Sequence, residues 1–152
     1  MKQEYLPIAD LVPHAGPMLL LDELVSVGNG SLTARVTPRA DGLFGDANSV
    51  GGWLGLEYMA QTMAALAGWE GLQRDEPPRV GFMLGSRRYH TYVSEFAVGV
   101  PLLVTATREF QADNGIGVTQ CIITATDGTL LAEAMLSAYQ PESLAEFLKE
   151  HA

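Results

Sequence analysis

A carboxylate that can transfer a proton, Glu57, and an amide that can hydrogen-bond it, Gln61, lie one helical turn apart in the apolar stretch "GGWLGLEYMAQTMAALAGWEGL", residues 51–72. Residues four apart share one face of a helix, so Gln61 can hydrogen-bond the Glu57 carboxylate. A buried carboxylic acid tends to keep its proton, as a general acid near pH 7 must. Glu57 is therefore a candidate general acid. The alternatives are that Glu57 is solvated and only complements the helix dipole, and that Gln61 is a surface amide.

A general acid normally works with a base, and the chain contains three histidines, His14, His90 and His151. His14 could act as that base, or it could have a structural role in ordering the approach to the first strand. His90 is expected at the surface, and His151 lies in the C-terminal tail. The three are far apart and lack the spacing of metal ligands, so we predict no metal site.

The elements that would position these residues can be predicted from hydrophobic periodicity. A helix is expected over residues 53–72, and because it is apolar on every side, other elements must wrap around it. Strands are expected on both sides of an Asn29-Gly30 turn and again after the helix, with the last three forming a meander. The remaining predictions are a short helical turn at 6–12, a loop at 39–52 and a C-terminal helix at 141–150. The expected post-helix strands are 80–90, 101–111, 115–126 and 129–140.

This order predicts one α+β domain over residues 1–152, in which a curved antiparallel sheet wraps around the long helix, as in a hotdog fold. An α/β doubly wound fold is not expected, because strands and helices do not alternate along the chain.

Composition narrows the class of protein further. The chain of 152 residues is 47% hydrophobic and has a formal net charge of −9, which argues against a nucleic-acid partner. The single cysteine, Cys121, excludes an intramolecular disulfide and is expected to pack inside a strand. The N-terminal region has no apolar run long enough for a signal peptide or a membrane span, so a cytoplasmic protein is expected.

Three segments carry a resemblance to a known family. The segments "PHAGPMLLLD" (13–22), "GWLGLEYMAQ" (52–61) and "GFMLGSRRYHTYVSEFAVGVPL" (81–102) resemble, in order, three motifs of the β-hydroxyacyl-acyl-carrier-protein dehydratases. The resemblance runs from about residue 12 to residue 137. The stretch "LFGDANSVGGWLGLEYMAQ" (43–61) is similar to the divergent ApeP-like dehydratases of aryl polyene clusters.

The resemblance implies an active site at a dimer interface. A histidine would take the C2 proton of the substrate, and the acid matched by Glu57 would protonate the leaving hydroxyl. The residue matched by Gly52 would present its backbone N–H to the thioester carbonyl. Trp53 and Tyr58 could line the acyl pocket or simply pack in the core. Asp46, in the loop before the helix, is a further candidate for this site, although aspartate is also common in loops.

The substrate and partners implied by the resemblance are an acyl-carrier-protein or coenzyme A thioester and a second hotdog subunit, identical or different. No cofactor is expected beyond the phosphopantetheine that carries the substrate, and neither nucleic acid nor a membrane is expected as a partner. Arg79, Arg87 and Arg88 lie close together near a Pro-Pro break and could dock an acidic carrier protein or a phosphate. The alternative is solvated surface charge.

The sequence departs from the family at one position that matters for the chemistry. The family's histidine before the helix falls on Leu43 in "GLF", and neither way of aligning this loop places a histidine there. Two versions of a dehydratase therefore stay open. Either the chain works alone with His14 as its base, or a partner subunit supplies the histidine. A catalytically inactive acyl-binding subunit and a hotdog thioesterase are the alternatives from other functional classes.

Overall fold

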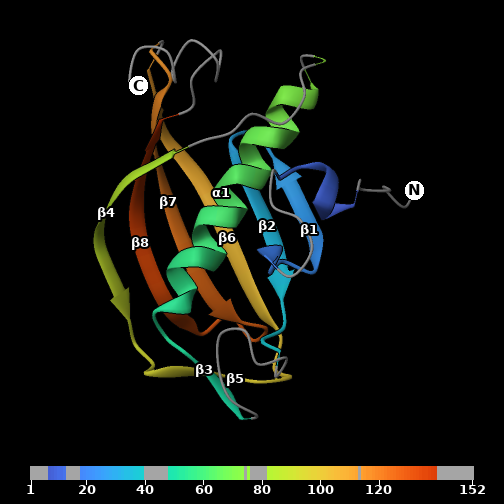
Figure 1. Cartoon of the computed structure of the whole chain (residues 1–152), viewed down its shortest axis with the longest axis vertical. Coiled ribbons are helices and arrows are strands. Elements are labelled where there is room, and N and C mark those ends of the chain that lie inside the picture. The colour runs from blue at the N-terminus through green and yellow to red at the C-terminus, as the bar shows by residue number, and fades with distance from the viewer. Residues whose placement is uncertain are drawn as a thin grey trace.

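Six strands form one antiparallel sheet in the order β1-β2-β6-β7-β8-β4 in the computed structural model (Figure 1). The structure describes residues 7–12, 18–39, 48–73, 75, 82–112 and 114–139. Two further strands, β3 and β5, pair with each other in a small second sheet beside the start of the helix. The strands are β1 (Glu23–Gly28), β2 (Ser31–Val36), β3 (Ser49–Gly51), β4 (Phe82–Thr91), β5 (Glu95–Ala97), β6 (Leu102–Gln111), β7 (Ile116–Ala125) and β8 (Leu130–Tyr139).

Turn residues set the register of the hairpins. Gly30 adopts a φ of 73° between β1 and β2, a conformation that costs glycine little, and the expected Asn29-Gly30 hairpin is confirmed. Between β7 and β8 the Asp127 carboxylate accepts a hydrogen bond from the Thr129 N–H at 2.9 Å. That bond favours the charged carboxylate and holds the pKa of Asp127 below its usual range. The predicted meander of β6, β7 and β8 is confirmed.

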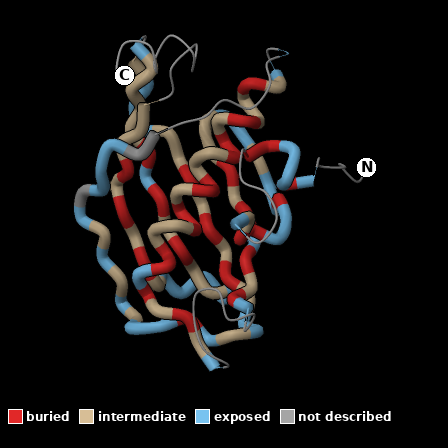
Figure 2. The backbone as a smooth tube through the Cα atoms, viewed as in Figure 1, coloured by how far each residue is buried: buried red, intermediate tan, exposed pale blue. Residues whose placement is uncertain are grey.

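The long helix α1 (Leu54–Leu72) crosses one face of the large sheet, as Figure 1 shows. Its buried side chains meet alternate residues of the strands beneath, which gives the sheet the period-2 pattern of burial in Figure 2. Near the C-terminal end of α1, Gly68 lies against the backbone of Leu11, just after the short helix η1 (Ile8–Asp10). A Cβ at Gly68 would overlap the Leu11 carbonyl oxygen, so glycine permits this close approach.

The expected α+β architecture, with one long helix on a curved antiparallel sheet, is therefore confirmed, as is the helical turn near the N-terminus. The expectation that residues 39–52 form only a loop is wrong, because Ser49–Gly51 forms β3.

Strand β5 is also absent from the sequence-based expectation. Both strands have three residues, too few for an alternating pattern to appear. The predicted C-terminal helix lies outside the described residues. Within the described part of the chain, no helix is long and apolar enough to cross a membrane.

Candidate active site at the start of helix α1

The chain enters α1 through the small β3–β5 sheet. Val50 pairs with Phe96 and Gly51 with Glu95, and the Ser49 hydroxyl donates a 2.7 Å hydrogen bond to the Glu95 carboxylate. These contacts fix the direction in which the helix begins, and so the position of the side chains in its first two turns.

Both backbone groups of Gly52 are engaged, by β4, by the turn that follows it and by the first turn of α1. The Gly52 N–H donates to the Ser94 carbonyl at 2.9 Å, and the Gly52 carbonyl accepts from the Tyr89 hydroxyl and from the Gly55 N–H. The Gly52 N–H thus has an acceptor within the chain, and its role toward a thioester carbonyl stays a prediction. Gly52 is buried, and a Cβ there would lie 3.0 Å from the Val93 carbonyl oxygen.

Glu57 and Gln61 are joined as their spacing predicts. The Gln61 amide nitrogen donates to Glu57 Oε1 at 3.0 Å and to the Met18 carbonyl at 2.7 Å. The Gln61 amide oxygen accepts from the Leu20 N–H at 2.9 Å. The Gln61 side chain is fully buried, so the alternative of a helix-surface amide is wrong. Glu57 is half-buried in the single chain.

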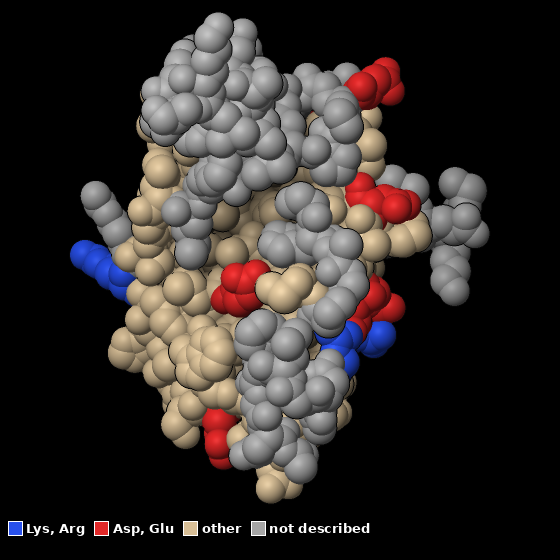
Figure 3. All heavy atoms as spheres, in the orientation of Figure 1, with Lys and Arg blue, Asp and Glu red and all other residues tan. Residues whose placement is uncertain are grey.

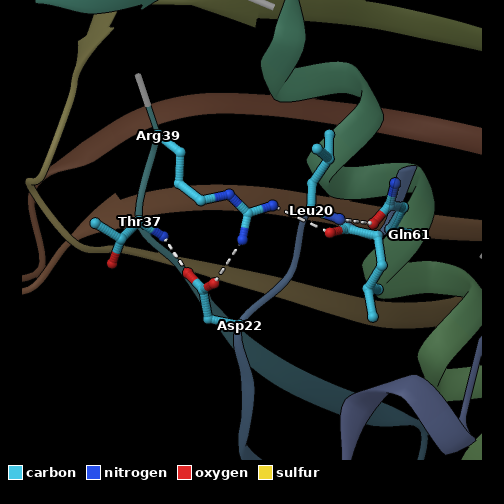
Figure 4. Close-up of polar contacts among 6 residues, drawn as sticks. Leu20, Asp22, Thr37, Arg39 and Gln61 are labelled. Carbon is cyan, nitrogen blue, oxygen red and sulfur yellow. Dashed lines mark hydrogen bonds and ion pairs between the residues drawn. The ribbon is translucent and has the colours of Figure 1, made fainter. Parts of the chain in front are cut away.

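The segment that passes Gln61 is also held from its other side (Figure 4). Arg39 donates to the Leu19 carbonyl at 3.1 Å and forms an ion pair with Asp22 at 3.3 Å. The Asp22 carboxylate also accepts from the Thr37 N–H at 2.6 Å. Residues 18–22 are thereby fixed between α1 and the end of β2. His14 precedes this segment and lies outside the described residues.

A small pocket opens beside this segment. Its apolar wall consists of Leu20, Val36, Val50, Leu54 and Tyr58, and Thr37, Pro38 and Arg39 complete the lining. Leu54 and Tyr58 lie in the first turns of α1, as Glu57 does, so the pocket and the carboxylate are at the same end of the helix.

The aromatic candidates fall in different places. Tyr58 is buried, lines the pocket and packs against Phe96 with ring centroids 6.1 Å apart, so it serves both pocket and core. Trp53 is 63% exposed at the start of the helix and is not part of the pocket wall. Asp46 lies outside the described residues.

Two other reactive side chains lie away from this site. The exposed His90 ring packs on Tyr92 with centroids 4.4 Å apart, and the Tyr92 hydroxyl donates to Glu133. That bond to a carboxylate raises the pKa of Tyr92.

Cys121 is fully buried, as expected, and burial raises the pKa of its thiol to about 12. Among the described residues, no group of three His, Cys, Asp or Glu side chains is placed to hold a metal ion.

Most of the basic side chains that the structure describes are already neutralised. Arg35 pairs with Glu23, Arg39 with Asp22 and Arg108 with Glu70. Arg88, at a bulge in β4, is exposed and makes no ion pair with any described residue. Of the other two predicted docking residues, Arg79 lies outside the described residues, as does the side chain of Arg87. Figure 3 shows few charged side chains on the described surface around the helix.

Sequence reasoning missed Tyr89 and Arg39, which bond the residues around the start of α1 from other elements. Tyr89 sits in a strand where any aromatic residue is common, so its type gave no functional signal. Arg39 follows β2 in a stretch that reads as a loop. Asp22 was part of the N-terminal motif, but its partner could be found only from the fold.

Comparisons with known proteins show the family to which the chain belongs. The family model for ApeP-like proteins, described as ApeP dehydratase, matches residues 6–149. The dehydratase heterocomplex ApeI:P from Xenorhabdus doucetiae contains a chain of the same fold, with a TM-score of 0.86 and 30% identity. The match covers 96% of this chain and 97% of that one.

More distant structures share the fold alone. The E. coli PaaI protein of the phenylacetic acid degradation operon has 16% identity and a TM-score of 0.60, with 78% of each chain covered. A hypothetical thioesterase from Streptococcus pneumoniae TIGR4, solved with coenzyme A, has 14% identity and a TM-score of 0.61, covering 78% of this chain and 84% of that one. No curated protein sequence matches the chain significantly. The match over nearly the whole length shows that the chain belongs to the ApeP-like dehydratase family of hotdog proteins.

Proposed function

We propose that this chain is one subunit of a 3-hydroxyacyl-acyl-carrier-protein dehydratase, with Glu57 as general acid and a histidine of a second hotdog subunit as base. The observation that carries the proposal is the buried Gln61 amide, which holds the Glu57 carboxylate near the start of a largely apolar helix. An apolar side chain could fill the space of Gln61 without needing any hydrogen-bond partner. The presence of a fully bonded amide therefore supports a role for the acid that it holds.

The reaction follows from the chemistry of a 3-hydroxyacyl thioester. The base removes a proton from C2, and the C3–O bond breaks as Glu57 transfers its proton to the departing hydroxyl. The electron pair of the C2–H bond becomes the C2–C3 double bond, and water leaves. Glu57 is then a carboxylate, which the N–H of Gln61 stabilises. The proton held by the base returns to Glu57 through solvent and completes the cycle.

A partner supplies the base in this proposal. His90 is the only histidine among the described residues, and it packs against Tyr92 on the strand outside the pocket. The similar solved chain comes from a dehydratase heterocomplex. Use of His14 by the isolated chain is the alternative, and the experiment below separates the two.

The free edge of β4 is the surface that we assign to the partner. Among the described strands, β4 pairs only with β8, on one side, and Leu84 on β4 is 58% exposed. Exposed edge strands are natural sites for pairing with another chain. Because Tyr89 of β4 contacts Gly52, a subunit on this edge lies close to the start of α1.

The substrate's carrier is expected to approach from the same side. Arg88 on β4 has no acid to neutralise it among the described residues and can attract an acidic carrier protein or the phosphate of its phosphopantetheine arm. The apolar pocket at the start of α1 offers room for the part of the acyl chain nearest the thioester.

The test measures dehydration of a 3-hydroxyacyl-carrier protein by mass spectrometry. Three samples are compared: the chain alone, the ApeI-type subunit of the same organism alone, and both together. Loss of one water that is faster with both subunits than with either alone is the expected result. Water loss by the chain alone would favour His14 as the base, and release of free carrier thiol would indicate a thioesterase.

Two variants locate the chemistry within the complex. Glu57→Gln keeps the shape of the side chain but cannot donate the proton, so the gain from mixing the subunits should disappear. Glu109→Gln makes the same chemical change at an exposed position of β6 and should leave the rate unchanged. An inactive acyl-binding subunit would show equal rates for both variants and wild type.

A further inference from the structure

Tyr89 makes a contact that the dehydratase chemistry does not explain. It lies on the edge strand β4, and its hydroxyl donates a hydrogen bond to the carbonyl of Gly52, two residues before α1 begins. The Tyr89 side chain is half-buried, and its burial raises the pKa of the phenol. The hydroxyl therefore stays a proton donor throughout the physiological range.

The backbone of β4 is shaped so that Tyr89 can reach the helix. Arg88 and Tyr89 together face a single residue of β8, Ala134, which makes a β-bulge. Arg88 takes a φ of 57°, a left-handed conformation that is uncommon for arginine. Bulges re-aim side chains, and here Arg88 is exposed while Tyr89 turns toward α1.

The helix is shaped to receive the tyrosine. A Cβ at Gly55 would overlap the Tyr89 hydroxyl, so the first turn of α1 has no side chain where the phenol ends. The N–H of Gly55 donates to the same Gly52 carbonyl at 3.1 Å. The Gly52 N–H is held from the other direction by Ser94. The peptide groups that begin α1 are therefore fixed by residues from β4 and from the turn before β5.

We propose that Tyr89 is a positioning residue that couples the edge strand β4 to the first turns of α1 and so sets the position of Glu57. This inference rests on the proposed function for its kinetic consequence and on the hydrogen bond from Tyr89 to Gly52 for its structural one. A subunit that docks along β4 moves or stiffens the strand that carries Tyr89. The hydroxyl transmits that change to the helix, because it is bonded directly to the peptide group at its start.

Tyr89→Phe tests this proposal, with Tyr92→Phe as the matched control. Both changes remove one tyrosine hydroxyl from the same stretch, but the Tyr92 hydroxyl bonds only to the Glu133 side chain on the exposed sheet. In the two-subunit complex, Tyr89→Phe should lower kcat about tenfold with KM changed less than about twofold, since a small displacement of a catalytic group lowers rate more than binding. Tyr92→Phe should leave both constants unchanged. Equal kcat for Tyr89→Phe and wild type would overturn the proposal.

Hydrogen–deuterium exchange on the single chain separates this proposal from the proposed function. Loss of the hydroxyl should speed amide exchange in residues 54–57 of α1 by about tenfold, and Tyr92→Phe should not. If the wild-type complex removes no water but exchange rises as expected, the proposed function fails and the coupling holds. If exchange in residues 54–57 is the same in Tyr89→Phe and wild type, the coupling itself is wrong.

Discussion

Gln61 shows how a largely apolar helix can hold the carboxylate of Glu57 at a defined place near its start. Its fully buried amide donates to Glu57 and to the Met18 carbonyl, both partly buried, and accepts from the buried Leu20 N–H. The same side chain therefore orients the candidate acid and attaches the N-terminal segment to the helix. Such a network is stable only while all its members are present, because each unpaired polar group in the interior costs free energy.

Gln61→Leu should lower the free energy of unfolding by about 3 kcal/mol, because it leaves the buried Leu20 N–H without a partner and removes the bond to the partly buried Met18 carbonyl. Urea denaturation followed by circular dichroism measures the change. Gln120→Leu, at an exposed position of β7, should change stability by less than about 0.5 kcal/mol. Equal stability for the two variants would contradict the network.

Cys121 gives the fold a defined response to alkaline pH. Burial raises the pKa of its thiol to about 12 from an ordinary value of 9.0, so the unfolded chain loses this proton first. The protonated Cys121 thiol contributes its full share to the free energy of unfolding below pH 9. That share is lost as the pH rises toward 12, and the free energy of unfolding then falls by about 1.4 kcal/mol per pH unit.

The measurement for Cys121 is the free energy of unfolding at pH 8 and pH 10. Wild type should lose about 1 kcal/mol more than Cys121→Ala over this interval. An identical loss in the two proteins would show that the thiol does not titrate between folded and unfolded states as described.

Among the elements, α1 has glycine at two places where atoms of neighbouring elements approach it closely. Gly55 admits the Tyr89 hydroxyl near its start, and Gly68 admits the Leu11 backbone near its end. Both glycines are expected to lower helix propensity, so their presence is explained by packing against neighbouring elements. These contacts fix how far the helix can slide along the sheet.

Gly68→Ala should destabilise the protein by about 1–3 kcal/mol, although alanine is the better helix former, because the Leu11 backbone cannot move aside as a flexible side chain would. Thermal unfolding measures the change. Gly28→Ala, where a Cβ would meet nothing within 4 Å, is the control and should be near neutral. A rise in Tm for Gly68→Ala would show that the helix does not pack this closely.

Elements with strong local signals could be predicted from the sequence, and those set by tertiary contacts could not. The Asn29-Gly30 turn, the alternating strands after the helix and the uniformly apolar helix each carry their own pattern. Strands β3 and β5 form only because each finds the other, and their three residues show no periodicity. The same holds at the site. The Glu57–Gln61 bond follows from helical spacing, whereas Tyr89 and Arg39 reach their acceptors from distant parts of the chain.

At the scale of the whole molecule, the free edge of β4 lies next to the site at the start of α1, because Tyr89 of β4 contacts Gly52. The strand exposes Leu84 and Arg88 to an approaching chain and contacts Gly52 through Tyr89. The opposite edge of the sheet is β1, at the other end of the strand order from β4. Its first residue, Glu23, forms an ion pair with Arg35 of β2. Charged edge residues of that kind discourage pairing between strands.

Leu84→Asp should weaken association with the ApeI-type subunit at least about tenfold, because it places a charge on the surface assigned to the partner. Analytical ultracentrifugation of the mixed subunits measures the dissociation constant. Val25→Asp makes a similar change on the exposed edge strand β1 and should leave association unchanged. If Val25→Asp disrupts the complex and Leu84→Asp does not, the partner binds at β1.

The most direct test of the account is the rate of water loss from a 3-hydroxyacyl-carrier protein by the two-subunit complex, with wild-type chain or Glu57→Gln. We expect the variant to assemble normally and to lose at least about a hundredfold in kcat, as removal of a general acid does. A complex that contains Glu57→Gln and dehydrates at the wild-type rate would contradict the central claim, because the carboxylate held by Gln61 would then have no part in the chemistry.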